Sequence, residues 1–414
     1  MSITLPRNIF NLKGQVVKDI RLSDDNNCLV IHCRRNKKYK AIDPQTNCRG
    51  TINTYVRRKI KDIPMLGFPC LIEVELAQVY LNKNERRIEG CDFVNKGCFY
   101  TKRFCRLISG LCRHASIAAV SNYFGLRWET VKNIDKEYLE STLPALNPEE
   151  LTDLKYIGVD EVARAKGHDY MTVVYNMETG QLIWVETGRT AQTFSLFLQA
   201  LPKDTAQGIL AVAMDMGPSY QKSVKDYLPH ADIVFDRFHV MQNYSKAISN
   251  QRRMEFRKAD YAGKKLIKGS KFLLLRNADK LSEKQQGKLK KLLSENTNIN
   301  IIYVLKEQLQ ALWQNNSYED MAKALDAWCE MADESGLVYI KRFAKSLRRN
   351  KVGICNYAKH RITSARIEAG NVGIGMIRKR ARGIRDTEYF KLKIRQLSVP
   401  EDTNIFFQKS KNAA

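Results

Sequence analysis

The chain has 414 residues, 44% of them hydrophobic and 27% charged, enough for two to four domains and at least one sizeable core. Lys and Arg number 69 against 44 Asp and Glu, so the formal net charge is +25. This basic excess predicts a polyanionic partner, with nucleic acid the first choice and a merely basic soluble protein the alternative. No apolar run reaches membrane-span length and the first residues lack a signal-peptide core, so we expect a cytoplasmic protein without a membrane partner.

Residues 1–100 are predicted to form a small β-rich module. Cys28–Arg35 and Leu71–Leu81 are strand-like by their β-branched content and partial alternation, and a basic stretch at 57–61 lies between them. We interpret the module as a degenerate, zinc-finger-like DNA-binding module.

Cysteines are concentrated in this part of the chain, because eight of the ten fall between Cys28 and Cys112. Zinc ligands normally come as C-x2-C pairs, and the region contains none. Ordinary buried, reduced cysteines are therefore the alternative to a zinc site built from Cys33, Cys48, Cys91 and Cys98.

Residues 101–141 are predicted to form a helix-turn-helix. A first helix covers 101–114, a second can begin at Ser116 and end at Gly125, and a third amphipathic helix follows. The third helix is expected to bury Trp128, Val131, Ile134 and Leu139. A plain helical bundle is the alternative; a helix-turn-helix would present to the major groove Arg127, Glu129, Thr130, Lys132 and Asn133.

Residues 151–258 are predicted to form the first part of an α/β core. The order of elements is three strands in an antiparallel meander, a helix, a strand, a helix and a strand, which is typical of an RNase H-like fold with a mixed five-stranded sheet. The expected strands are Tyr156–Glu161, His168–Asn176, Gln181–Thr187, Gly208–Asp215 and Ala231–Asp236.

Two of these strands, the first and the fourth, are predicted to end on an aspartate. In an RNase H-like fold they lie side by side, so Asp160 and Asp215 would meet at one edge of the sheet. Adjacent carboxylates repel each other unless a cation lies between them, and oxygen ligands suit Mg²⁺ or Mn²⁺. A single aspartate at a strand end can also be a turn former, but two at matching ends favour a metal site.

Residues 259–355 have helical periodicity throughout and are predicted to form an all-helical insertion with solvated charged faces. Residues 356–400 are predicted to complete the core, with Glu368 near the start of a helix. Between Met376 and Leu397 there are eight Lys or Arg against two acids. This density favours phosphate contact over a merely solvated basic face, and the candidate residues are Arg378, Lys379, Arg380, Arg382 and Arg385.

Taken together, these segments resemble bacterial insertion-sequence transposases of the DDE class, specifically the ISL-three family. The resemblance spans nearly the whole chain and rests on the motifs IGVDE, AMDMGPSY and VFDRFHV and on a C-terminal block. The family's closing pattern is E-G-x-N-x-x-I-K, a basic cluster, G-[FY]-R and YF-x-L-[RK]. It is matched here by Glu368, Asn371, Ile374, Arg378 to Arg380, Gly383, Arg385, Tyr389, Phe390 and Leu392.

The chain departs from the family pattern at three places. Ala369 replaces a usual Gly, and Gly375 replaces a usual Lys. Gly373 and Gly375 each weaken a helix by about 1 kcal/mol relative to Ala. The family's N-terminal zinc finger has C-x2-C pairs, whereas here only Cys48 fits that pattern, with Gln45 at its partner position.

The resemblance implies a metal-dependent DNA transposase with the catalytic, metal-binding triad Asp160, Asp215 and Glu368 and two Mg²⁺ or Mn²⁺ ions. It implies double-stranded DNA as partner, both as terminal inverted repeats and as target, and a homodimer or larger assembly near the bacterial nucleoid. His239 is expected either near the active site or as a structural residue. The alternatives are an RNase H-fold nuclease that cleaves without joining, and an inactive transposase-derived DNA-binding protein.

Overall fold

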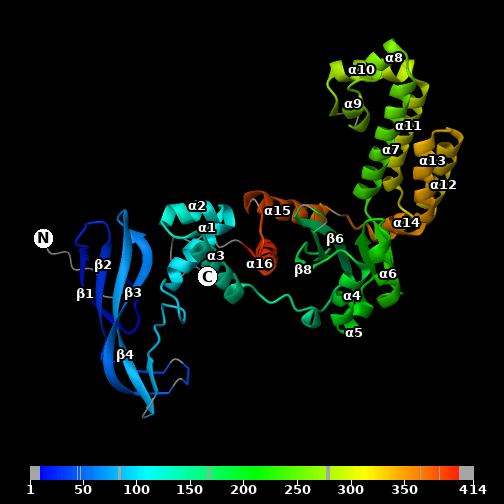
Figure 1. The fold of residues 1–414 in the computed structure, drawn as a ribbon. Helices are drawn as coiled ribbons and strands as arrows, with labels where there is room; N and C mark the ends of the chain where they lie inside the picture. The colour runs from blue at the N-terminus through cyan, green and yellow to red at the C-terminus, as the bar shows by residue number, and fades with distance from the viewer. Residues whose placement is uncertain are drawn as a thin grey trace. The chain divides into compact units, whose positions relative to one another are not determined.

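The computed structural model describes residues 10–43, 45–46, 48–82, 85–165, 167, 169–276, 280–363, 365–381 and 383–400. These residues form two compact units, each containing one sheet and its own helices (Figure 1). The first unit comprises Met1–Leu143, Arg380–Arg382 and Glu388–Ala414, and the second comprises Pro144–Lys379 and Gly383–Thr387. Within the described ranges, no helix combines the length and apolarity needed to cross a bilayer.

The first unit begins with a five-stranded sheet in the order β1-β2-β4-β3, with β5 also paired to β4. Only the β2–β4 pair is parallel. The basic stretch expected between two strands is itself part of the long strand β3, whose exposed outer face hides its strand character from a hydrophobicity pattern. The strands are β1 (Gln15–Leu22), β2 (Leu29–Arg35), β3 (Thr51–Met65), β4 (Phe68–Asn82) and β5 (Glu85–Ile88).

Three helices follow in the same unit: α1 (Lys102–His114), α2 (Ile117–Phe124) and α3 (Trp128–Thr142). Ser116 caps α2 by accepting a hydrogen bond from the Ala119 N–H, and Gly125 ends it in the left-handed conformation, both as predicted. Val131, Ile134 and Leu139 are buried as expected. Trp128 is not, because it lies at the first position of α3 with half of its surface exposed.

Helix α16 (Thr387–Leu397) packs in this unit, although the sequence placed it in the final part of the catalytic core. Its contact with the three helices centres on the fully buried Asp135 of α3. The Asp135 carboxylate accepts hydrogen bonds from Ser109 (2.5 Å) and Tyr389 (2.5 Å) and pairs with the Lys393 ammonium at 3.1 Å. Lys393 also donates to the backbone carbonyl of Cys112, so a charged network ties α16 to α1 and α3.

The second unit contains a five-stranded sheet in the order β10-β9-β6-β7-β8. Strands β6, β7 and β8 form an antiparallel meander, while β9 and β10 run parallel to β6, so the predicted element order is confirmed. The strands are β6 (Tyr156–Ala165), β7 (Asp169–Asn176), β8 (Leu182–Thr187), β9 (Ala211–Met214) and β10 (Asp232–Phe235). The short helix η1 (Pro148–Glu150) precedes them, and the helices between them are α4 (Ala191–Ala200), α5 (Lys203–Gly208) and α6 (Pro218–Tyr227).

Strand β6 is longer than the sequence predicted. It continues to Ala165 because residues beyond Asp160 pair with β7, from Glu161 opposite Thr172 to Ala165 opposite Asp169. Asp160 therefore lies inside the strand rather than at its end, which corrects the prediction. What ends near Asp160 is the parallel pairing with β9, whose last pair is Gly158 with Ala213.

A helical insertion rises from the sheet along α7 and α11, with α8, α9 and α10 at its far end and α12 and α13 beside the stem (Figure 1). Its apolar residues are continuous with the core of the sheet, since both belong to one buried cluster. The helices are α7 (Arg237–Lys258), α8 (Tyr261–Ile267), α9 (Lys271–Leu275), α10 (Glu283–Glu295), α11 (Thr297–Ala311), η3 (Leu312–Gln314), α12 (Tyr318–Glu334), α13 (Val338–Arg349) and α14 (Lys351–His360). Helix α15 (Ala365–Ala381) follows.

Candidate active site

Three aspartates lie level with one another across β6, β9 and β10. Gly158 pairs with Ala213, and Phe235 pairs with Met214, in two parallel ladders. Continued by two residues, the first register places Asp160 opposite Asp215; continued by one residue, the second places Asp236 opposite Asp215. The three aspartates therefore lie side by side where the parallel pairing ends. One carboxylate in β6 and one directly after each of β9 and β10 thus form one row, which we call the aspartate row.

Asp160 accepts two hydrogen bonds but pairs with no cation among the described residues. Its Oδ1 accepts from the Glu161 N–H at 2.8 Å, and its Oδ2 accepts from the Asn371 amide at 2.6 Å. Burial raises the pKa of the Asp160 carboxyl; the two hydrogen bonds and His239 lower it by less, and the nearby Asp215 charge adds a still smaller rise. The pKa of Glu161 is raised too, by burial and by the charge of Asp215.

The other two aspartates each leave part of their hydrogen-bonding capacity unused. Asp215 accepts from the Gly217 N–H at 2.7 Å, which shapes the turn into α6. Asp236 is buried and caps α7 by accepting from the Phe238 N–H at 3.1 Å. Its Oδ2 is buried with no hydrogen-bond partner among the described residues, and the closest ring nitrogen, Nε2 of His239, is 4.0 Å away. A buried carboxylate oxygen left unsatisfied is costly, so this atom is a candidate ligand for a cation.

Helix α15 lies directly on the aspartate row. A Cβ at Gly158 of β6 would come within 2.5 Å of Ile367, and a Cβ at Gly370 of α15 would come within 2.5 Å of the Tyr175 hydroxyl, so two glycines permit this close approach. Glu368, which is partly buried, precedes Asn371 by three positions. Residues three apart share a helix face, so Glu368 lies on the face from which Asn371 reaches Asp160.

Arginines fix α15 along β6. Arg366 donates to the backbone carbonyls of Met177 and Glu178, and Arg378 donates to that of Ala163 at 2.7 Å. Arg164 in turn donates to the carbonyl of Ile384. The helix is therefore hydrogen-bonded to the sheet on both sides of the Asn371–Asp160 contact.

The acids are suited to a divalent cation in chemistry but have not converged. Within the ranges that the structure describes, no three His, Cys, Asp or Glu side chains gather closely enough to hold a metal ion. The oxygen-only donor set and the unsatisfied Asp236 oxygen fit a hard ion such as Mg²⁺.

Comparison with known proteins places this site in a family. Residues 157–394 match the sequence model of the ISL3 transposases with a DDE domain, and residues 91–139 match that of the helix-turn-helix domain of the same family. The chain is 32% identical over 352 residues to the transposase for insertion sequence element IS1001 of Bordetella parapertussis, covering 84% of this chain and 86% of that protein. It is 25% identical over 312 residues to the transposase for IS1557 of Mycobacterium tuberculosis, covering 70% of each.

The chain belongs to the ISL3 family of transposases. It is accordingly an enzyme that acts on DNA, and the helix-turn-helix is confirmed for the region around α1 to α3. The family also implies divalent metal ions, in agreement with the donor set of the aspartate row.

The predicted DNA-contacting residues of this transposase have different surroundings. In the helix-turn-helix, Arg127 and Asn133 are exposed, whereas Thr130 and Lys132 are partly buried. In the C-terminal block, Lys379 and Arg385 are exposed. Arg378 and Arg380 are partly buried and each donates to a backbone carbonyl, of Ala163 and Arg113 respectively; their contact with DNA stays a prediction. Arg382 lies outside the described residues.

The four predicted zinc ligands of the transposase do not form a cluster. Among the described residues, no three metal-binding side chains lie close enough together to hold an ion. Cys33, Cys91 and Cys98 pack against the apolar core of the first unit, and Cys48 is exposed. Burial raises the pKa of the Cys33 thiol to about 12 and that of Cys91 to about 11, which disfavours the thiolate that zinc requires. Cys33, Cys91 and Cys98 are partly buried, whereas a hydrogen bond with Cys105 lowers the pKa of Cys98 to about 6.

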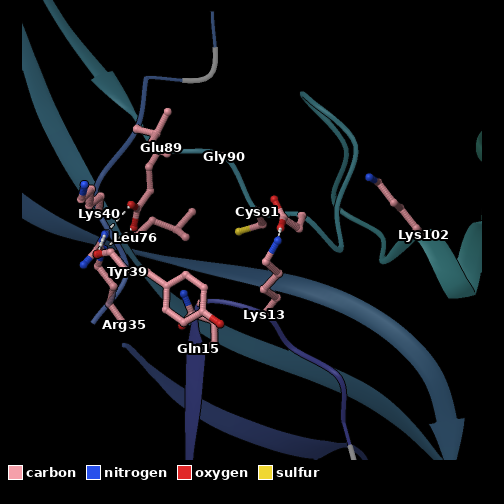
Figure 2. Close-up of a pocket in the computed structure, with 13 residues that line it drawn as sticks. Lys13, Gln15, Arg35, Tyr39, Lys40, Leu76, Glu89, Gly90, Cys91 and Lys102 are labelled. Carbon is pink, nitrogen blue, oxygen red and sulfur yellow. Dashed lines mark hydrogen bonds and ion pairs between the residues drawn. The ribbon is translucent and has the colours of Figure 1, made fainter. Parts of the chain in front are cut away.

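A cavity of about 410 Å³ on the sheet of the first unit provides a contrast with the aspartate row (Figure 2). At its floor Arg35 and Glu89 form a bidentate ion pair, in which Arg35 donates to Glu89 at 2.7 and 3.0 Å. At its rim Lys13 pairs with Asp92 at 2.8 Å. Because protein cations already neutralise both acids, this cavity offers no free carboxylate to a metal ion.

Sequence reasoning missed two residues of the site. Asp236 follows its strand as Asp215 follows β9, and the repeated strand-then-aspartate pattern could have identified it. Asn371 was recognised as part of a motif but not as a partner of Asp160, because no local signal predicts a contact over 211 positions.

Proposed function

We propose that the chain cleaves DNA strands at the ends of an insertion sequence and joins them to a target, using Asp160, Asp215 and Glu368 as catalytic, metal-binding acids. The observation that carries this proposal is the aspartate row, in which Asp160 and Asp215 stand level on adjacent strands without a protein cation. Divalent ions bound there would activate a hydroxyl or water for phosphoryl transfer and stabilise the leaving oxygen.

The chain's own residues have distinct parts in this proposal. Asp160 and Asp215 supply carboxylate oxygens from the rigid centre of the sheet. Asn371 orients the Asp160 carboxylate through its amide hydrogen bond, and so acts as a positioning residue. Glu368, on the same face of α15, would bring the third acid over the row. Asp236 is well placed to add a fourth oxygen, since its Oδ2 is buried and unsatisfied.

The sheet order β10-β9-β6-β7-β8, with three antiparallel strands followed by two parallel ones, supports an RNase H-like catalytic core. In that division the core comprises residues 151–258 and 356 to the end of α15, interrupted by the helical insertion. The first unit would read the terminal inverted repeats, with Arg127 and Asn133 at the exposed start of α3 as base-contacting residues. Joining two DNA ends to one target requires at least two copies of the chain.

A strand-transfer assay tests the proposal. The substrate is a linear duplex carrying the DNA that flanks the coding region, incubated with the full chain, Mg²⁺ and a supercoiled plasmid target. We expect cleavage and joining by the wild type, and loss of both below detection in Asp160→Asn, Asp215→Asn and Glu368→Gln. The matched control is Asp204→Asn, an exposed acid on α5 of the same unit, which should retain activity.

Other outcomes would identify the alternatives. Cleavage without joined products would favour a nuclease on the same fold, and binding without cleavage in any divalent ion would favour an inactive DNA-binding protein. Undiminished strand transfer by Asp160→Asn would overturn the assignment of the site.

A further inference from the structure

The far end of the helical insertion carries a surface that the catalytic site does not explain. Between Tyr261 and Glu295, which span α8, α9 and α10, there are ten Lys or Arg against three acids. All ten cations are exposed: Lys264, Lys265, Lys268, Lys271, Arg276, Lys280, Lys284, Lys288, Lys290 and Lys291. We call these residues the basic tip.

Helices α12 and α13 of the same insertion also have a solvated surface, but it is not basic. Helices α12 and α13, from Tyr318 to Arg349, carry six Lys or Arg and six Asp or Glu, so their net charge is zero. Two of their acids are in ion pairs, Asp333 with Arg348 at 2.6 Å and Asp326 with Lys351 at 2.6 Å. The basic excess is thus confined to one part of the insertion, whereas a general need for solubility would affect both parts.

The arrangement on α10 is also unfavourable for the helix itself. Lys284, Lys288 and Lys291 are spaced by four and three positions, so they form one exposed stripe that runs beside the buried Leu289 and Leu292. Like charges at this spacing destabilise a helix by about 0.2–0.5 kcal/mol per pair. Among the described residues, the stripe has one ion pair, a 3.9 Å contact between the exposed Lys291 and Glu295. A polyanion would relieve this repulsion.

The tip is held firmly on its stem by buried polar contacts. Lys306 of α11, only 2% exposed, donates to the backbone carbonyls of Leu274 and Arg276 at the end of α9, at 3.3 and 2.8 Å. Arg252 of α7 donates to the carbonyl of Ile267 at the end of α8. Cations at helix C-termini stabilise those ends. The exposed lysines are therefore presented on an ordered scaffold.

Two largely exposed aromatic side chains lie among these lysines. Tyr261 is 87% exposed and Phe272 is 66% exposed. Large exposed rings within a cationic surface are a common feature of nucleic-acid-binding faces, where they pack on sugars or bases. Their presence favours DNA over a small anion as the occupant.

We propose that the basic tip is a second DNA-binding surface, which holds the phosphate backbone of duplex DNA away from the site of cleavage. The proposal takes DNA as the partner from the proposed function, but it does not depend on which acids are catalytic. Helix α7 begins directly after Asp236 and has 22 residues. It is therefore about 33 Å long, the length of about ten base-pair steps. The tip would contact DNA about one helical turn from the aspartate row.

Salt dependence of binding tests the proposal on the full chain. The probe is a fluorescein-labelled 40-base-pair duplex of arbitrary sequence, and the readout is the slope of log binding constant against log salt concentration. This slope is negative, and each lost phosphate contact reduces its magnitude by about 0.9. We expect the triple variant Lys284→Gln, Lys288→Gln, Lys291→Gln to reduce the magnitude of the slope by about 2–3.

The matched control is Lys323→Gln, Lys341→Gln, Lys345→Gln, which removes three exposed lysines from α12 and α13. It should leave the slope unchanged. Equal slopes for the two triple variants would overturn the proposal. Gln retains helix propensity and relieves like-charge repulsion, so the tip variant should also unfold at the same or a higher temperature.

Lysine acetylation of the unaltered protein gives an independent measurement. The same duplex should protect Lys284, Lys288 and Lys291 from acetylation and leave Lys323, Lys341 and Lys345 reactive. Uniform protection, no protection, or stronger protection by a single-stranded 40-mer would each contradict a duplex-binding tip. Neither measurement requires catalysis, so loss of cleavage in Asp160→Asn with normal tip protection would separate the two proposals.

Discussion

Asp135 in the first unit and Asp160 in the second are both carboxylates removed from water, and their surroundings differ completely. Asp135 receives a serine hydroxyl, a tyrosine hydroxyl and the Lys393 ammonium, so its charge is compensated within the protein. Asp160 receives one amide and one backbone N–H, while burial and, to a smaller extent, the like charge of Asp215 raise its pKa. The first arrangement is that of a structural ion pair. The second has no compensating protein cation among the described residues, as the proposed metal site requires.

The largest loss of stability is expected at Asp135, because another residue of the protein compensates its charge. Asp135→Ala leaves Lys393 buried without its carboxylate, and should lower the free energy of unfolding of the first unit by about 3–5 kcal/mol. Hydrogen exchange of the α1–α3 amides measures this. The double variant Asp135→Leu, Lys393→Met removes both charges and should recover part of the loss. Simple additivity of the two single effects would show that the pair is not coupled.

Metal ions should stabilise only the second unit. At a Mg²⁺ concentration 100 times its dissociation constant, binding raises the free energy of unfolding by about 2.7 kcal/mol. Thermal unfolding with and without Mg²⁺ measures this in the wild type. Asp215→Asn should lose the response and Asp204→Asn should keep it. A response that survives in Asp215→Asn would place the ion elsewhere.

The metal-free protein should respond to pH through Asp160. Its folded pKa is raised above the ordinary 3.8, so the folded state binds a proton more tightly than the unfolded state. The stabilisation is present in full below that ordinary value and is lost as pH rises through the folded pKa. We expect this decline in the free energy of unfolding to be smaller than the effects of Asp135→Ala and of Mg²⁺ binding. Urea unfolding in EDTA measures it; Asp160→Asn should flatten it, and saturating Mg²⁺ should remove it.

The smallest effect concerns the positioning residue. Asn371→Ala removes the amide donor to Asp160 and should cost about 1 kcal/mol of stability. It should also raise the pKa of Asp160 further, since that hydrogen bond lowers it, so Mg²⁺ binding should require a higher pH. Isothermal titration with Mg²⁺ across a pH series measures the shift. Lys379→Ala, an exposed change on the same helix, is the control; equal behaviour of the two variants would contradict a positioning role.

Local patterns in the sequence predicted the elements that carry their own signals. The cap at Ser116, the turn at Gly125 and the meander of β6, β7 and β8 depend on residues close together in the chain. The pairing of β6 with β9 also followed, because strand order in a known arrangement determines neighbours.

Contacts between distant residues could not be predicted in the same way. Two of the errors were local instead: β6 extends beyond Asp160 through its hairpin partner β7, and Trp128 is exposed because α3 begins at that position. The structural roles of Arg378 and Arg380 depend on carbonyls more than 200 positions away. The sequence does not distinguish a basic residue that binds a phosphate from one that binds a backbone oxygen.

The packing of α16 in the first unit has a consequence for the order of synthesis. Asp135 leaves the ribosome 254 residues before Tyr389. At 5–20 residues per second this interval lasts about 13–50 s. During that time α1, α2 and α3 carry a carboxylate whose cation has not yet been made, so these helices reach their final stability only when the C-terminal segment emerges. We therefore expect α1 to α3 to be less stable in C-terminally truncated products than in completed copies of the enzyme.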